Sequence, residues 1–148
     1  MLTRRTAAAL IFTSFIAACS GTTSTLNDSS ESAARVYPVD EAIADRILAS
    51  AMASEFPGRP VSPVAIPNAG YQYQIIFGLD SHNIAAYMIP AKGIREDGEI
   101  VNGYYFEVSH SGTMPFTGSN RSKSLFERII ANASAVAKPV NLASTGTD

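Results

Sequence analysis

Residues 71–79 read YQYQIIFGL, and this stretch decides the fold class. Large apolar or aromatic residues occupy every second position, which predicts a β-strand because successive strand side chains point to opposite faces. Two further strands are expected at residues 84–89 and 103–110. A polar turn at residues 80–83 and a polar loop at residues 92–102 separate the strands. Such short connections favour antiparallel neighbours.

One helix is expected on each side of these strands. Residues 40–55 begin with Asp40 as N-cap, carry apolar residues at helical spacing and are followed by Pro57-Gly58, with Glu55 outside the apolar stripe. Residues 119–133 form the second helix, with Gly118-Ser119 as its turn and N-cap. The predicted order is α-β-β-β-α. This is a single small α+β domain of two layers, in which both helices cover one face of a three-stranded antiparallel sheet.

The rest of the chain divides around this domain, which is expected at residues 37–140. Residues 19–36 are small and polar, and we expect a disordered tether because they cannot bury enough apolar surface to offset their ordering entropy. Three prolines at positions 60, 63 and 67 predict an extended, irregular connector. Residues 141–148 are expected to be a flexible tail.

The start of the chain carries an export pattern. Arg4-Arg5 precede an apolar stretch at residues 7–18, which is too short to span a membrane. The run Ile16-Ala17-Ala18-Cys19 ends in the only cysteine of the chain. This layout resembles the lipobox of bacterial lipoproteins, whereas an ordinary signal peptide cut after Ala18 is the competing interpretation.

The resemblance implies that residues 1–18 are removed and that the thiol of Cys19 is joined to diacylglycerol. It further implies a protein held in the bacterial cell envelope by covalent lipid. Ser20, in place of an aspartate after the cysteine, favours the outer membrane. Paired arginines also leave a twin-arginine export route open, although the general secretory route fits the following residues better.

Charge excludes one class of function. Removing residues 1–18 leaves nine basic against 13 acidic residues, a net charge of −4, compared with −2 for the whole chain. Nucleic-acid binding requires clustered Lys and Arg, so this composition argues against it. We expect no cofactor, and the expected partner is another envelope protein.

Catalytic groups are scarce. The two histidines are His82, in the expected turn, and His110, at the end of a strand. A small envelope hydrolase centred on His110 is the alternative function, but Ser109 and Ser111 are sequence neighbours and should point to the opposite face of the strand. Glu96, Asp97 and Glu99 are expected to form a solvated hairpin tip and not a metal site, because the spacing of a calcium loop is incomplete.

The best local site candidate precedes the second helix. Apolar residues stand in an otherwise polar, glycine-containing loop, which is typical of contact with a partner or ligand. Backbone N–H groups at a helix start could also hold an anion there. The candidate residues are Gly112, Met114, Phe116, Gly118, Ser119 and Arg121.

Tyrosines on the expected strands suit either a partner surface or ordinary half-exposed packing. They are Tyr71, Tyr73, Tyr87, Tyr104 and Tyr105. The sequence therefore predicts a non-enzymatic binding or assembly module that uses an open sheet face, an edge strand or the loop at residues 112–119.

Overall fold

A computed structural model describes the backbone of residues 22–27, 35–59, 62–66, 70–77, 82–112 and 115–143, with side chains for residues 35–59, 83–110 and 120–143. Neither described helix is both long and apolar enough to cross a membrane. The elements, in chain order, are β1 (Thr22–Asn27), β2 (Arg35–Val36), α1 (Glu41–Glu55), β3 (Ser62–Ile66), β4 (Gly70–Phe77), β5 (His82–Ile94), β6 (Ile100–Gly112), α2 (Pro115–Val136) and β7 (Val140–Leu142).

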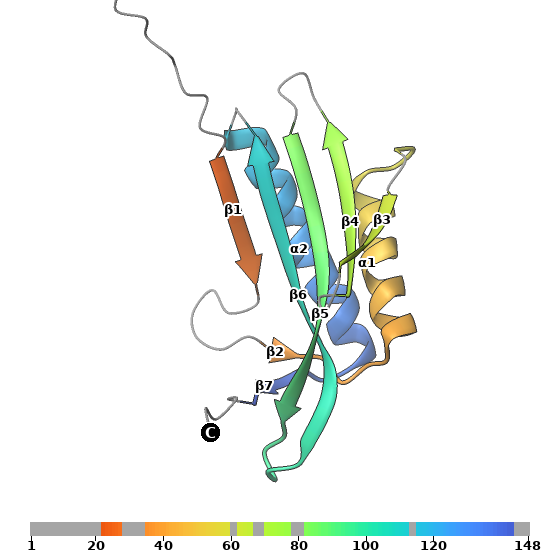
Figure 1. The fold of residues 1–148 in the computed structure, drawn as a ribbon, viewed down its shortest axis with the longest axis vertical. Coiled ribbons are helices and arrows are strands. Elements are labelled where there is room, and N and C mark those ends of the chain that lie inside the picture. The colour runs from red at the N-terminus through yellow and green to blue at the C-terminus, as the bar shows by residue number, and fades with distance from the viewer. Residues whose placement is uncertain are drawn as a thin grey trace, which may run out of the picture.

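The fold is a small α+β domain with two helices and an antiparallel sheet, which confirms the predicted class. The three expected strands are β4, β5 and β6, and they are antiparallel neighbours. The sheet is larger than expected, because its strand order is β1-β6-β5-β4-β3, with β7 also paired to β5 and β2 paired to β7. Both helices lie behind the sheet in Figure 1.

The additional strands were missed for two different reasons. β3 lies in the proline-rich segment, where Pro63 pairs with Tyr73. Proline is tolerated there because β3 is an edge strand of the sheet. β1 lies inside the expected disordered tether, and Leu26 is its only large apolar residue. Its three threonines favour β-structure, but it lacks the apolar alternation that identifies a strand. It gains its place through main-chain pairing with β6, from Thr22 opposite Gly112 to Asn27 opposite Glu107.

The β5–β6 hairpin is longer than expected. The polar loop predicted at residues 92–102 is mostly strand, with Lys92 opposite Asn102 and Ile94 opposite Ile100. Its turn is tight: the Arg95 carbonyl accepts from Gly98 N–H, and Gly98 has φ of 88°, which glycine adopts without strain.

Pro90 does not end β5, although the expected strand stopped at residue 89, just before this proline. Its pairing partner is Tyr104. The main-chain N–H and C=O of Tyr104 both form hydrogen bonds with Tyr37 and not with β5, with N–O distances of 3.0 and 2.8 Å. The Pro90–Tyr104 pair therefore exchanges no main-chain hydrogen bond, and the missing proline N–H removes none from the ladder.

The first and last segments of the domain meet beside the half of this hairpin that is nearer its turn. β2 pairs with β7, and β7 pairs with β5, while Tyr37 bridges to Tyr104 of β6. The expected flexible tail at residues 141–148 is thus strand at its start, since Asn141 and Leu142 belong to β7. Gly103 permits this arrangement because a Cβ there would lie 2.2 Å from the Tyr37 carbonyl oxygen.

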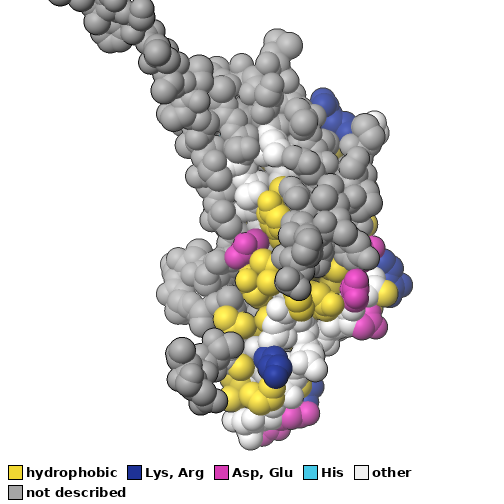
Figure 2. All heavy atoms as spheres, viewed as in Figure 1, with side chains coloured by type: hydrophobic (Ala, Val, Ile, Leu, Met, Phe, Trp, Pro, Cys, Tyr) yellow, Lys and Arg dark blue, Asp and Glu magenta, His cyan; other side chains and the backbone are white. Residues whose placement is uncertain are grey.

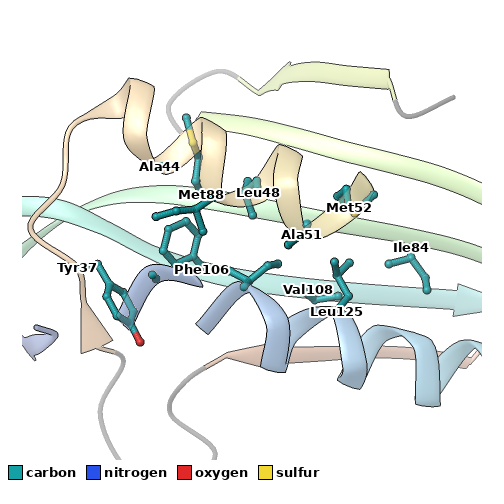
Figure 3. Close-up of a cluster of buried hydrophobic side chains, with 14 of the residues drawn as sticks. Tyr37, Ala44, Leu48, Ala51, Met52, Ile84, Met88, Phe106, Val108 and Leu125 are labelled. Atoms are coloured by element: carbon teal, nitrogen blue, oxygen red, sulfur yellow. The ribbon is translucent and has the colours of Figure 1, made fainter. Parts of the chain in front are cut away.

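The core lies between the helices and one side of the sheet, as Figure 3 shows. Most of the expected apolar stripe on α1 is buried, namely Ile47, Leu48, Ala51 and Met52, while Ile43 is partly buried. Asp40 is the N-cap of α1 and accepts from Ile43 N–H at 2.8 Å. The Tyr37 and Phe106 rings meet at 5.7 Å between centroids. The fully buried sheet residues here are Ile84, Ala86, Met88, Phe106 and Val108, and we call their side of β5 and β6 the helix face.

Candidate functional site

The structure rearranges the predicted loop. Gly112 is the last residue of β6, and α2 begins at Pro115, four residues earlier than expected. Proline suits this first helical position because its missing N–H has no partner within the helix. Phe116, Gly118 and Ser119 are consequently helical, so Gly118-Ser119 is not the turn and N-cap of α2. The side chains of these three residues, and the whole of Met114, lie outside the described part.

Arg121 is engaged within the protein and so does not support the anion-site hypothesis. Its Nη1 donates to the main-chain oxygen of Glu55 at 3.2 Å and to Glu55 Oε1 at 3.0 Å. The guanidinium also lies 6.0 Å from the centre of the Phe56 ring. Arg121 therefore fastens the start of α2 to the end of α1.

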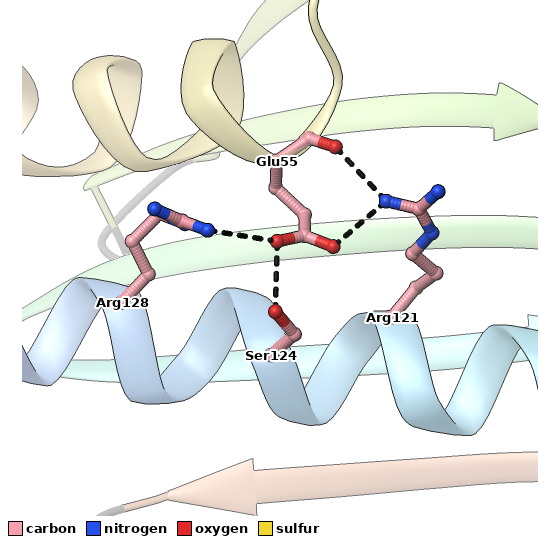
Figure 4. A network of polar contacts seen from close by, with 4 residues as sticks. All are labelled: Glu55, Arg121, Ser124 and Arg128. Atoms are coloured by element: carbon pink, nitrogen blue, oxygen red, sulfur yellow. Dashed lines mark hydrogen bonds and ion pairs between the residues drawn. The ribbon is translucent and has the colours of Figure 1, made fainter.

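Glu55 is the centre of a polar network that the sequence analysis missed (Figure 4). Its carboxylate accepts from Ser124 Oγ at 2.8 Å and lies 3.5 Å from Arg128 Nη2. Glu55 is only 6% exposed, whereas it was expected outside the apolar stripe. The signal was present, because position 55 follows Leu48 by seven residues and Ala51 by four, which is the spacing of one helix face.

His110 occupies the helix face and is 2% exposed. Ser109 lies on the opposite side of β6, where its hydroxyl is 3.3 Å from the Tyr87 hydroxyl. The two side chains cannot act as a nucleophile and base together, and the burial of His110 does not favour the hydrolase alternative. His82 is the first residue of β5 and not part of a turn, while its side chain, like that of Ser111, lies outside the described part.

The acidic residues near the hairpin turn form an exposed tip, as predicted. Glu99 forms an ion pair with Arg95, and Glu96 lies 3.7 Å from Lys138 Nζ. Asp97 Oδ1 accepts from the main-chain N–H of Glu99 and stabilises the turn. Among the described residues, no group of three or more His, Cys, Asp or Glu side chains is placed to hold a metal ion.

The remaining candidate is the side of β5 and β6 that turns away from the helices. We call it the open face and define it by Tyr87, Ile89, Tyr105, Glu107 and Ser109, which are all half-buried. Tyr87 is directly opposite Glu107, and Ile89 is opposite Tyr105. Figure 2 shows hydrophobic side chains gathered over these strands on the face turned to the viewer.

Tyr105 and Glu107 are two positions apart on β6 and therefore share this face. Burial, and then the negative charge of Glu107, raises the pKa of the Tyr105 phenol above its ordinary value of 10.0. The phenol thus stays neutral and can donate a hydrogen bond. Two aromatic side chains, an aliphatic one, a carboxylate and a hydroxyl make an amphipathic surface suited to protein contact.

The predicted tyrosines divide between the two sides. Tyr87 and Tyr105 belong to the open face, whereas Tyr104 packs against the core. In the register of β4, Tyr73 pairs with Ala86 of the helix face and Gln72 pairs with Tyr87 of the open face. The side chains of β4, including those of Tyr71 and Tyr73, are outside the described part.

A second surface lies at the far end of the hairpin. A hollow of about 1150 Å³ there is lined in part by Glu41, Lys92, Tyr104 and Leu142. Ile100, which also lines it, is 53% exposed. This end of the molecule therefore displays apolar side chains beside the charged tip.

Comparison with models of known protein families and with curated proteins found no match for this chain.

Proposed function

We propose that this protein is a lipid-anchored component of the bacterial cell envelope that works as a non-enzymatic binding or assembly module. Its partner is another envelope protein, and its contact surface is the open face. The observation that carries the proposal is the row of half-buried Tyr87, Ile89 and Tyr105 on a side of the sheet that no described helix covers.

The chemistry of this surface favours a protein partner. Tyrosine buries a large apolar area while its hydroxyl still forms hydrogen bonds, which is why it is enriched in interfaces. Glu107 and Ser109 supply polar groups beside the aromatic rings. A partner that covered this surface would complete the burial of rings that are already partly removed from water.

The anchor is proposed from the lipobox alone. Replacing Cys19 by Ser removes the thiol that would carry the lipid. We expect Cys19→Ser to abolish incorporation of labelled fatty acid and to move the protein into the soluble envelope fraction. Unchanged labelling of this variant would refute lipid attachment at Cys19.

Site-specific photocrosslinking in intact cells tests the binding surface. A photoreactive amino acid at position 105 or 89 should capture the same partner, and Ile89→Arg should abolish capture from position 105. The matched control is the photoreactive residue at position 131, since Ala131 is exposed on α2. Equal capture from positions 105 and 131 would refute the open face as the binding site, provided that thermal unfolding confirms that the variants are folded.

A further inference from the structure

The pairing of β1 with β6 determines which end of the domain can lie near an anchor at Cys19. Only three chain steps separate Cys19 from Thr22, and these span at most about 11 Å even when fully extended. Thr22 is opposite Gly112, at the end of β6. By contrast, an unpaired segment from Cys19 to Arg35 could reach about 55 Å. Strand pairing therefore removes most of the reach that a disordered tether would have.

The two ends of the long axis differ in what they contain. β1 and α2 both begin at the end near Gly112, whereas the β5–β6 turn lies at the opposite end (Figure 1). β6 has 13 residues, so about 40 Å separates these ends at the rise of a β-strand.

We propose that β1 holds the Gly112 end of the domain against the lipid surface and directs the hairpin tip away from it. This inference rests on the proposed anchoring at Cys19. The hollow lined by Ile100 and Leu142 then points away from the membrane, towards partners in the envelope, and the open face stands roughly perpendicular to the bilayer. Phe116, in the first turn of α2, belongs to the end next to the lipid.

The orientation can be measured with single labels. Once Cys19 carries lipid, an introduced cysteine is the only free thiol, because the chain has no other cysteine. Asn120→Cys places a fluorophore near the start of α2, and Asp97→Cys places one at the tip; both native residues are exposed. In vesicles of phosphatidylethanolamine and phosphatidylglycerol with nitroxide-labelled headgroups, the label at position 120 should be quenched several-fold more than that at position 97. Equal quenching would overturn the proposal.

A second variant tests whether β1 is responsible. Neighbouring residues in a strand point their N–H groups in opposite directions, so one of Ser24 and Thr25 donates towards β6. Replacing both by proline removes that donor, whichever of the two residues supplies it. It should make quenching at positions 120 and 97 similar, whereas Ser24→Ala with Thr25→Ala should preserve the difference. Persistence of the difference in the proline variant would refute the role of β1.

Hydrogen exchange separates this inference from the proposed anchoring. Every second amide of Thr22–Asn27, those that donate to β6, should exchange slowly in the full chain and rapidly in the double proline variant, with or without lipid. Rapid exchange in the parent protein would overturn the orientation while leaving lipid attachment intact. Absence of fatty-acid labelling would instead refute the anchoring that the orientation requires.

Discussion

The same two strands present contrasting surfaces to the two sides of the sheet. On the helix face, Met88, Phe106 and Val108 are fully buried against α1 and α2. On the open face, Ile89 and Tyr105 remain half-buried, although they alternate with those core residues along the chain. Both sides are rich in apolar residues, so hydrophobicity alone does not distinguish core from contact surface. What distinguishes them in the described part of the chain is that α1 and α2 cover only one side.

The largest expected effect compares two neighbouring aromatic residues. Phe106→Ala leaves a cavity beside Tyr37 in the core and should lower the free energy of unfolding by about 3–5 kcal/mol. Tyr105→Ala, one residue away on the open face, should lower it by about 1 kcal/mol or less. Denaturant unfolding monitored by circular dichroism measures both. Equal losses would show that the open face is packed as tightly as the helix face.

The second prediction concerns the half of the β5–β6 hairpin nearer its turn. Residues 37–38 lie there against Gly103, on the side of β6 that belongs to the open face in the other half. Gly103→Ala places a methyl group 2.2 Å from the Tyr37 carbonyl oxygen and should cost up to about 3 kcal/mol. Gly98→Ala is the matched control in the turn of the same hairpin. It meets nothing within 4 Å and should cost about 1 kcal/mol, through its positive φ alone.

If Gly103→Ala destabilised the domain no more than Gly98→Ala, the crossing of residues 37–38 over β6 would not contribute to stability. The distinction between an open half and a covered half of the hairpin would then fail.

The third prediction tests the polar attachment between the helices. Glu55→Gln keeps the shape of the side chain but removes the charge that Arg121 and Arg128 contact, and it should cost about 2 kcal/mol. Glu99→Gln at the exposed hairpin tip also breaks an ion pair with arginine, but it should cost less than about 1 kcal/mol because solvent screens that pair. Thermal unfolding at low and high salt checks both, and a stronger salt effect on the Glu99 pair is expected.

The smallest expected effect is a titration on the open face. Because the pKa of Tyr105 is raised in the folded protein, its contribution to stability is present below about pH 10 and is lost as the pH rises through the folded pKa. Tyr105→Phe should therefore weaken the fall in stability above pH 10. Glu107→Gln should lower the pKa only partly, since burial is the larger cause. Ultraviolet absorbance of the phenolate follows this titration. A fall in stability above pH 10 that is unchanged in Tyr105→Phe would contradict the prediction.

Much of the core could be predicted because periodicity carries the information. The alternation from Tyr104 to Val108 located a strand, and the spacing of Ile47, Leu48 and Ala51 located a helix face. The candidate site was harder to predict. The loop expected before Ser119 became a helix starting at Pro115, and the neighbours of Arg121 come from a helix more than sixty residues earlier. Local pattern does not report such distant partners.

The sequence by itself determined the α+β class, the N-cap at Asp40, the end of α1 and the three central strands. Each depends on interactions within a few residues, or on a repeating separation of apolar from polar side chains. Only the tertiary structure placed β1, β2, β3 and β7 in the sheet. These strands are short, polar or proline-containing, and they are ordered by main-chain hydrogen bonds to neighbours that are distant in sequence. Tertiary packing also decided which apolar side of β5 and β6 became core, because only one side is covered by the helices.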